Sequence, residues 1–138
     1  MTDQELIKLA LDARKNAYAP YSHFCVGAAL LAKDGRIYKG CNIENSSYGV
    51  TICAERTAFF KAVSEGERQF DRIAIVGGME DDEIPKGYAF PCGPCRQVMR
   101  EFSNPKEFNV IVAKSTDDYQ SYLLKELLPH SFGPENIY

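Results

Sequence analysis

Three short, largely apolar segments constrain the fold of this chain more than any other feature. They are residues 24–32 (FCVGAALLA), 72–77 (RIAIVG) and 108–113 (FNVIVA). None shows the strict alternation of a half-exposed strand, and their apolar character is typical of strands covered on both faces. Because helical patterns lie between them, the sequence predicts a mixed sheet with helices on its faces, which is the α/β class.

The helices are predicted from terminal residues and from apolar spacing. Thr2 and Glu5 fit a capping box at the start of a helix over residues 2–18. The apolar residues of this helix recur at helical spacing and are Leu6, Leu9, Ala10, Ala13 and Ala17. Two further helices are predicted at about 53–65 and about 94–102, the second with one apolar face.

The connections between the predicted strands and helices determine where the cysteines of the candidate site lie. Asp34-Gly35 predicts a two-residue hairpin turn, after which a strand at about 36–40 returns along the first strand. Right-handed crossovers between the later strands place both internal helices with their N-termini at the same edge of the sheet. We therefore expect Cys53 to lie close to Cys92 and Cys95.

Composition excludes several classes of protein. With 138 residues, the chain is expected to form one domain over residues 1–138, and its net charge of −3 argues against a nucleic-acid partner. No apolar run approaches the ~18 residues of a membrane span, and the N-terminus lacks the pattern of a signal peptide. An odd count of five cysteines then favours metal ligation or catalysis in the cytoplasm over a disulfide framework.

Two motifs carry the chemistry, Cys53-Ala54-Glu55 and Pro91-Cys92-Gly93-Pro94-Cys95. Three thiolates can bind zinc and leave the fourth tetrahedral position open, which is the pattern of a catalytic site. Both groups stand where a helix begins, and the backbone N–H groups there favour thiolate over thiol. In the first turn of a helix Cys53 and Glu55 can reach one small volume, where burial would raise the pKa of the carboxyl group.

These motifs resemble the zinc nucleoside and nucleobase deaminases, whose signature is H/C-x-E followed by P-C-x-x-C. The all-cysteine form, with Phe24-x-Val-Gly-Ala-Ala-Leu, Asn42-Ile-Glu-Asn45 and Arg96-Gln97, is similar to the small homotetrameric cytidine deaminases. The resemblance implies a three-layer α-β-α sandwich with about five strands, one Zn²⁺ per subunit, and a homotetramer with shared active sites. It also implies pyrimidine salvage by hydrolytic deamination of cytidine and deoxycytidine to uridine and deoxyuridine plus ammonia.

The resemblance also implies roles for individual residues. Cys53, Cys92 and Cys95 would bind zinc, and Glu55 would shuttle protons to and from a zinc-bound hydroxide. Phe24 would stack on the pyrimidine, and the Ala54 backbone would bind the edge of the base. Asn42 and Glu44 would bind the ribose hydroxyls. Tyr48 and Phe132 would reach into the sites of neighbouring subunits.

Three thiolates on Zn²⁺ leave a formal charge of −1, which opposes ionisation of a bound water. A compensating positive charge is therefore expected near the sulfur atoms. Arg56 follows Glu55 directly, and the family resemblance implies an arginine at that position that hydrogen-bonds the thiolates.

Four other interpretations compete with this one. Cys-Gly-Pro-Cys is also a thioredoxin-type redox motif, but that chemistry gives no role to Cys53-Ala54-Glu55, and the chain has no tryptophan. The second alternative is a structural zinc, to which Cys25 or Cys41 would donate a fourth sulfur. Within the deaminases, a nucleic-acid editor is disfavoured by the negative charge, and a deaminase of a blasticidin-type antibiotic is the remaining alternative. His23 and His130 are expected to be surface or packing residues.

Overall fold

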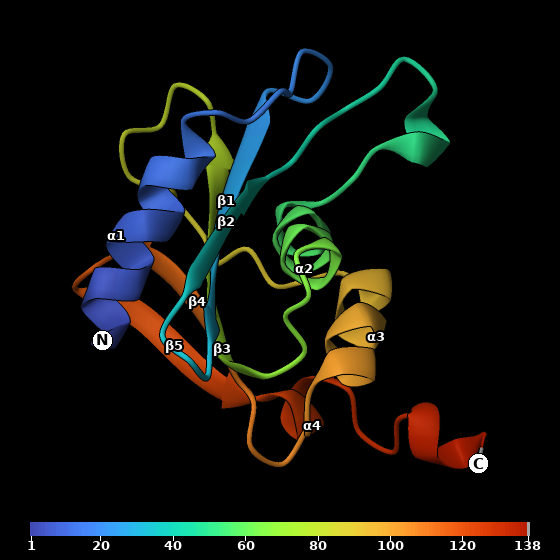
Figure 1. Cartoon of the computed structure of the whole chain (residues 1–138). Coiled ribbons are helices and arrows are strands. Elements are labelled where there is room, and N and C mark those ends of the chain that lie inside the picture. Colours follow the sequence, from blue (N-terminus) through green and yellow to red (C-terminus); the bar gives the residue numbers. More distant parts are fainter. Residues whose placement is uncertain (138) are drawn as a thin grey trace.

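The computed structural model describes residues 1–137 and is built around one five-stranded mixed sheet (Figure 1). The strands are β1 (Phe24–Ala32), β2 (Ile37–Cys41), β3 (Phe70–Met79), β4 (Asn109–Ser115) and β5 (Asp118–Leu123). They lie in the order β2-β1-β3-β4-β5, with β3 and β4 parallel and the other neighbouring pairs antiparallel. The predicted α/β class and mixed sheet are confirmed.

Helices cover both faces of the sheet. Helix α1 (Asp3–Arg14) lies on one face, and α2 (Ala54–Ser64) and α3 (Gly93–Phe102) lie together on the other (Figure 1). The short helix α4 (Leu124–Leu127) and two 3₁₀ turns, η1 (Tyr48–Val50) and η2 (Pro134–Asn136), complete the described elements. The arrangement is the predicted three-layer α-β-α sandwich. Within residues 1–137, no helix combines the length and the apolar character that crossing a bilayer demands.

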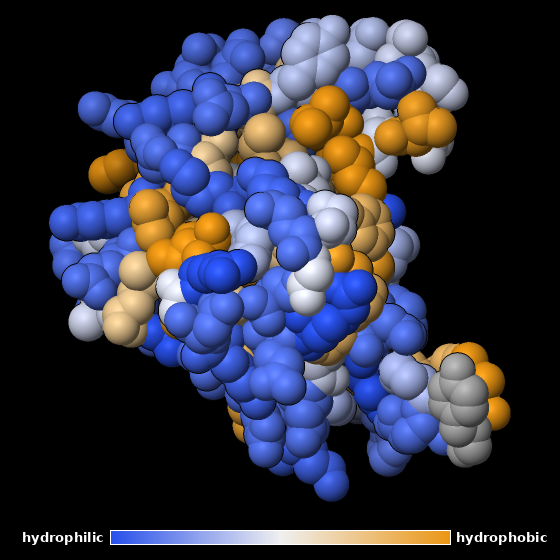
Figure 2. Space-filling view, viewed as in Figure 1, coloured by the Kyte–Doolittle hydropathy of each residue, from blue (hydrophilic) through white to orange (hydrophobic). Residues whose placement is uncertain are grey.

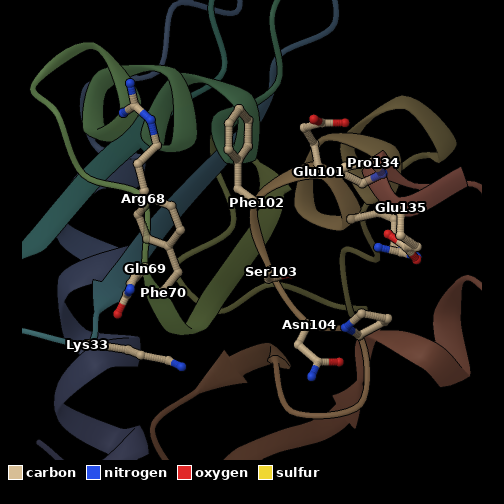
Figure 3. A pocket seen from close by; sticks show the side chains of 12 residues that line it. Lys33, Arg68, Gln69, Phe70, Glu101, Phe102, Ser103, Asn104, Pro134 and Glu135 are labelled. Atoms are coloured by element: carbon tan, nitrogen blue, oxygen red, sulfur yellow. The ribbon is translucent and has the colours of Figure 1, made fainter. Parts of the chain in front are cut away.

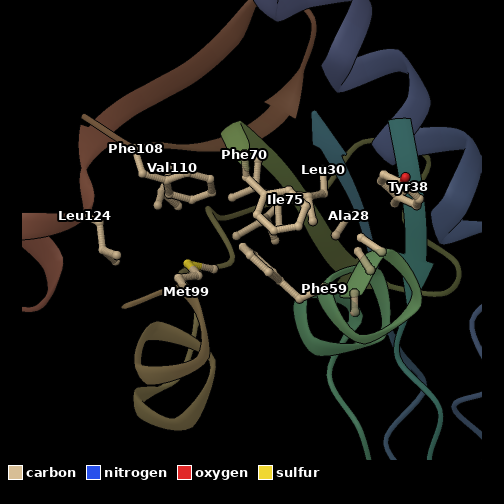
Figure 4. Close-up of a cluster of buried hydrophobic side chains, with 14 of the residues drawn as sticks. Ala28, Leu30, Tyr38, Phe59, Phe70, Ile75, Met99, Phe108, Val110 and Leu124 are labelled. Atoms are coloured by element: carbon tan, nitrogen blue, oxygen red, sulfur yellow. The ribbon is translucent and has the colours of Figure 1, made fainter. Parts of the chain in front are cut away.

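Two buried clusters explain why the strands are apolar throughout. Successive side chains of β1 point to opposite faces of the sheet, so Leu30 packs below α2 and α3 while Ala29 packs against α1. On the α2 and α3 side, Phe59 is the centre of the cluster, with its ring 5.1 Å from that of Phe70 and 6.0 Å from that of Phe108 (Figure 4). Both faces of the central strands are therefore removed from water.

Helix α1 has the predicted capping box but ends earlier than predicted. The Thr2 N–H donates to Glu5 Oε2 over 2.8 Å, and the Glu5 N–H donates to Thr2 Oγ1 over 3.1 Å. The helix stops at Arg14 rather than at residue 18. The chain turns there to reach the sheet, where the Tyr18 N–H donates to the Asn42 carbonyl over 3.0 Å. A tertiary contact thus ends the helix before its apolar pattern does.

The hairpin between β1 and β2 has a three-residue loop, so the prediction of a two-residue turn is wrong. The Ala32 N–H donates to the Arg36 carbonyl over 2.9 Å, which closes the loop of residues 33–35. Gly35 has a φ of +93°, the left-handed conformation that completes a three-residue hairpin. The same Asp-Gly pair therefore turns the chain with one more residue than expected.

Strand β5 was not among the strands predicted from apolar runs. It pairs antiparallel with β4 at the edge of the sheet, and its sequence DYQSYL is largely polar and exposed. An edge strand with one open side has no need of a continuous apolar run. The predicted strand at 72–77 is longer at both ends in the structure, where β3 runs from Phe70 to Met79.

Candidate active site

Three cysteine thiols meet where α2 and α3 begin. Cys53 is the N-cap of α2, Cys92 is the N-cap of α3, and Cys95 lies in the first turn of α3. The Sγ atom of Cys92 lies 3.8 Å from that of Cys53 and 3.3 Å from that of Cys95, and all three lie within 4.8 Å of one another. Ligands at 2.3 Å in a tetrahedral zinc site are about 3.8 Å apart, so this donor set fits zinc. The predicted juxtaposition is confirmed.

The cluster of described residues contains no fourth sulfur ligand. Cys25 lies in β1, and Cys41 ends β2 beside Thr57 and Lys61, in a separate small cavity. Burial raises the pKa of both the Cys25 and the Cys41 thiol, which favours the protonated form over the thiolate that binds a metal. A closed four-sulfur structural site therefore has no support among residues 1–137, and three protein ligands leave one coordination position open.

The histidines also lie outside the cluster. His23 Nδ1 lies 3.0 Å from Glu80 Oε1 at the surface, and His130 is an exposed residue of the C-terminal segment. Both adopt a left-handed backbone conformation, with φ of 60° and 51°. Their placement agrees with the prediction that they are surface residues.

Arg56 contributes a positive charge to the cluster. Its Nη2 donates to Cys53 Sγ over 3.4 Å, and its buried Nε has no hydrogen-bond partner among the described atoms. The pKa of Cys53 is lowered well below that of a free thiol, first because the Cys95 thiol donates to its sulfur and then because of Arg56. The pKa of Cys95 is raised in turn, since it keeps its proton to make that bond. The geometry therefore favours negative charge on sulfur.

Glu55 faces the interior from the first turn of α2. Its side chain is only 5% exposed, and it shares the buried face of the helix with Phe59 and Ala62. Burial raises the pKa of this carboxyl group to about 7, although its own backbone N–H favours the charged form. The group can therefore exist in both protonation states near neutral pH.

Glu55 and two of the thiols line one cavity of about 340 Å³, which we call the metal-site cavity. Its lining residues are Phe24, Val26, Asn42, Thr51, Ile52, Cys53, Ala54, Glu55, Ile75, Ala89, Phe90 and Cys92. The predicted residues Phe24, Asn42 and Ala54 are among them. Thr51 and Phe90 were not predicted, although each lies two residues before a metal-ligand candidate in the sequence. Of the described residues in this lining, Glu55 alone carries a carboxylate.

Asn42 is 9% exposed and holds the start of β1. Its Oδ1 accepts from the Val26 N–H over 2.9 Å, and its Nδ2 donates to the Phe24 carbonyl over 2.8 Å. These two bonds fix the orientation of the amide. One Nδ2 hydrogen and one Oδ1 lone pair remain free for a ligand.

Glu44 and Tyr48 line a second cavity of about 410 Å³ together with Tyr21, Ser22 and Thr51. We call it the Glu44 cavity. It adjoins the metal-site cavity, because Thr51 lines both. The structure thus separates the two predicted ribose-binding residues, with Asn42 in one cavity and Glu44 in the next.

Tyr48 and Phe132 are exposed in the isolated chain. Tyr48 in η1 is 73% exposed and Phe132 is 59% exposed, and Phe132 lines neither cavity. Ile43 and Val50 are exposed as well, and Figure 2 shows apolar surface over the loop that contains η1. Exposed apolar side chains that gather on one part of a surface are common in protein interaction sites.

A further cavity, of about 500 Å³, lies elsewhere (Figure 3). Its lining includes Lys33 at the far end of β1, Phe70 at the start of β3 and Ser103 after α3, so it lies at the edge of the sheet opposite the cysteines. Its buried arginine, Arg100, is already paired with Glu135. This cavity contains no metal-ligand cluster and no buried carboxylate among the described residues.

Comparisons with known proteins agree with the geometry. Residues 1–112 match the sequence profile of the family described as the cytidine and deoxycytidylate deaminase zinc-binding region. The chain is 49% identical to the cytidine deaminase of Sporosarcina psychrophila and 50% identical to that of Halalkalibacterium halodurans. These alignments cover 99% of this chain, and 96% and 98% of those proteins respectively.

A solved structure extends the agreement to the fold. The crystal structure of cytidine deaminase from Burkholderia pseudomallei superposes with a TM-score of 0.86 at 46% identity. The superposition covers 96% of this chain and 100% of that one. On its thiol cluster, its fold and these likenesses, the chain belongs to the zinc-binding cytidine and deoxycytidylate deaminase family.

Proposed function

We propose that this protein hydrolyses the 4-amino group of cytidine and deoxycytidine, giving uridine and deoxyuridine plus ammonia. The observation that carries the proposal is the position of Glu55, a buried carboxylate in the same cavity as the zinc-ligand thiols. The names of the full-length relatives, all cytidine deaminases, support the same substrate class.

The proposed chemistry depends on proton transfer by Glu55. Zinc bound by Cys53, Cys92 and Cys95 would supply a Lewis acid that makes water in the site easier to ionise. The Glu55 carboxylate takes a proton from the attacking water and delivers it to N3 of the pyrimidine. After the water oxygen has bonded to C4, Glu55 takes the remaining proton from that oxygen and delivers it to the departing amino group. The C4–N bond then breaks, and ammonia leaves.

The two adjoining cavities suggest how the nucleoside lies. The base would occupy the metal-site cavity, with its ring against Phe24 and its edge toward the Ala54 backbone. The sugar would reach past Thr51 from one cavity toward the other, so that Asn42 of the metal-site cavity and Glu44 of the Glu44 cavity can bind its hydroxyl groups. In this arrangement the base lies in an apolar pocket with an aromatic rim. The hydroxyl groups of the ribose donate to carboxylate oxygens.

Charge favours a free nucleoside over a phosphorylated one. Hydrogen bonds from Ser22 and the Tyr21 backbone lower the pKa of Glu44, so this carboxyl group is negative at neutral pH and repels phosphate. The net charge of the chain is also −3. These observations favour cytidine and deoxycytidine over their monophosphates and over nucleic acid. The two relatives are named cytidine deaminases, so the comparisons do not favour a blasticidin-type substrate.

An ultraviolet assay tests the proposed substrate. The purified zinc-loaded protein would be given cytidine, deoxycytidine, cytidine monophosphate and blasticidin S, with product identity checked by chromatography. We expect turnover of both nucleosides and much slower turnover of the other two compounds. If the protein turned over no nucleoside at one zinc per subunit, the proposed function would be wrong, and the three cysteines would form a structural zinc site.

Arg56→Ala is expected to weaken the metal site. Loss of the guanidinium leaves the negative charge on the three sulfur atoms without the donor that reaches Cys53. Groups that hydrogen-bond metal ligands typically change metal affinity or activity by about 10- to 100-fold. Zinc retention against a chelator and kcat for cytidine should both be measured. Arg68→Ala, an exposed arginine near the opposite edge of the sheet, serves as the control. Unchanged retention and kcat in Arg56→Ala would contradict this role.

We also propose that the chain assembles as a homotetramer, in which Tyr48 and Phe132 complete the active sites of neighbouring subunits. The enzyme would act in pyrimidine salvage in the cytoplasm. Both side chains are exposed in the single chain, and the loop that contains Tyr48 also exposes Ile43 and Val50. The five free thiols suit a reducing compartment.

Mixed assemblies test the sharing of sites. Tyr48→Ala subunits retain Glu55, and Glu55→Gln subunits retain Tyr48, so a reassembled mixture should contain sites with both intact residues. We expect each variant alone to be impaired and the mixture to recover part of the cytidine turnover. Sedimentation equilibrium should give a mass near four subunits. A monomer, or a mixture no more active than its components, would contradict the proposal.

A further inference from the structure

The hydroxyl group of Ser22 joins two residues of the proposed nucleoside site. Ser22 Oγ donates to Glu44 Oε2 over 2.5 Å and accepts from the Phe24 N–H over 3.0 Å. A serine hydroxyl has one hydrogen to donate and lone pairs to accept, so both bonds can be made at once. Glu44 lies in the Glu44 cavity and Phe24 in the metal-site cavity. Ser22 therefore connects the two.

The backbone of Phe24 is held at both ends by side chains. Its N–H donates to Ser22 Oγ, and its carbonyl accepts from Asn42 Nδ2. Phe24 is the first residue of β1, where it pairs with Met79 of β3, and the residue is 38% exposed. These two bonds fix the residue whose ring borders the base cavity.

Glu44 is held mainly by the segment that contains Ser22. Its Oε1 accepts the backbone N–H groups of Tyr21 and Ser22 over 3.0 Å and 3.2 Å, while its Oε2 accepts the Ser22 hydroxyl. If the hydroxyl were removed, Oε1 would keep both backbone donors, and Oε2 would lose the only partner it has among the described atoms. The carboxylate would stay in place, but its orientation would no longer be fixed.

The segment around Ser22 is itself anchored independently of Glu44. The His23 N–H donates to the Ala19 carbonyl over 3.0 Å, and the Glu80 N–H donates to the His23 carbonyl over 2.7 Å. His23 Nδ1 also faces Glu80 Oε1 at 3.0 Å. The position of the Ser22 hydroxyl is thus set by the backbone, which suits a group that orients others.

We propose that Ser22 is a positioning residue that orients the Glu44 carboxylate for recognition of the sugar, while the Phe24 N–H holds the Ser22 hydroxyl in place. The inference rests on the proposed function, because it assigns Ser22 to the binding of the same nucleoside. Ser22 and Glu44 line the Glu44 cavity, whereas the proton carrier Glu55 lines the metal-site cavity. Its loss should therefore weaken nucleoside binding and sugar discrimination, and should alter kcat little.

A matched pair of variants isolates the hydroxyl group. Ser22→Thr and Ser22→Val have nearly the same shape, but only threonine keeps the oxygen. For each variant, KM and kcat should be measured with cytidine and with 2′,3′-dideoxycytidine, which lacks the 2′ and 3′ hydroxyl groups of the sugar but keeps the 5′ hydroxyl. The exposed Ser121 on the edge strand β5 supplies the control, as Ser121→Ala.

We expect Ser22→Val to raise the KM for cytidine by about 10- to 100-fold, the range for losing a hydrogen bond to a charged group. The KM for 2′,3′-dideoxycytidine should change much less, so the preference for cytidine falls. Ser22→Thr and Ser121→Ala should keep the preference of the unaltered protein. A purely structural role would lower activity on both substrates equally.

The outcomes separate this inference from the proposed function. If the unaltered protein deaminates cytidine but Ser22→Val and Ser22→Thr behave alike, or if Ser22→Val weakens both substrates equally, the inference is overturned. If the unaltered zinc-loaded protein fails to deaminate cytidine, the proposed function fails first, before any variant is compared.

Discussion

Glu55→Gln is expected to lower kcat for cytidine by about 10³- to 10⁴-fold while the protein keeps one zinc per subunit. Glutamine preserves the shape of the side chain but can neither take a proton from water nor deliver one to the pyrimidine. Both proton transfers of the proposed reaction depend on this one group, which places the loss near the upper end of general acid–base effects. The KM for cytidine should change far less than kcat.

The thiol cluster should survive this substitution, because Glu55 is not among the three zinc-ligand candidates. Glu101→Gln, an exposed carboxylate on α3, is the matched control and should leave kcat unchanged. Zinc content, kcat and KM should be measured on all three proteins. Turnover within tenfold of the unaltered enzyme at full zinc occupancy would refute the assignment of Glu55 as the proton carrier.

Cys95→Ala is expected to abolish both zinc retention and turnover. Cys95 is only 1% exposed, so no outside ligand can easily replace its sulfur. With two thiols left, we expect zinc affinity to fall by more than about 100-fold, since even residues that only support metal ligands cost 10- to 100-fold. Metal that had been bound at 100 times its Kd contributes about 2.7 kcal/mol to stability, and this contribution should be lost as well.

The cysteines outside the cluster provide matched controls. Cys41→Ala and Cys25→Ala also remove partly buried thiols, but neither thiol belongs to the three-sulfur group. Both should retain one zinc per subunit and most of the activity. If Cys41→Ala lost its metal together with its fold, the site would be a four-sulfur structural centre, and the catalytic interpretation would be wrong.

The metal site could be predicted from the sequence more completely than some elements of the fold. Cys53, Cys92 and Cys95 could be brought together from topology, because crossover handedness and the ends of parallel strands restrict where internal helices begin. The outward-facing β5 could not be predicted in the same way, since an edge strand has no continuous apolar run. The early end of α1 depends on a bond between Tyr18 and the Asn42 carbonyl, 24 positions away.

Within the site, long-range contacts set the same limit. Glu44 could be assigned to the sugar only by resemblance, and its placement in a second cavity required the structure. The link from Ser22 to Glu44 joins two loops that are 22 residues apart, and no local pattern indicates it. Thr51 and Phe90 could have been suspected from their nearness to the metal-ligand candidates, but only the cavity shows that they line it.

A zinc titration of the metal-free protein tests the central claim most directly. Zinc would be added stepwise under reducing conditions, and cytidine turnover would be measured against bound zinc per subunit. We predict that turnover is absent at the start, rises in proportion to bound zinc, and reaches its plateau at one zinc per subunit. Full turnover in the metal-free protein, or none at one zinc per subunit, would contradict the account.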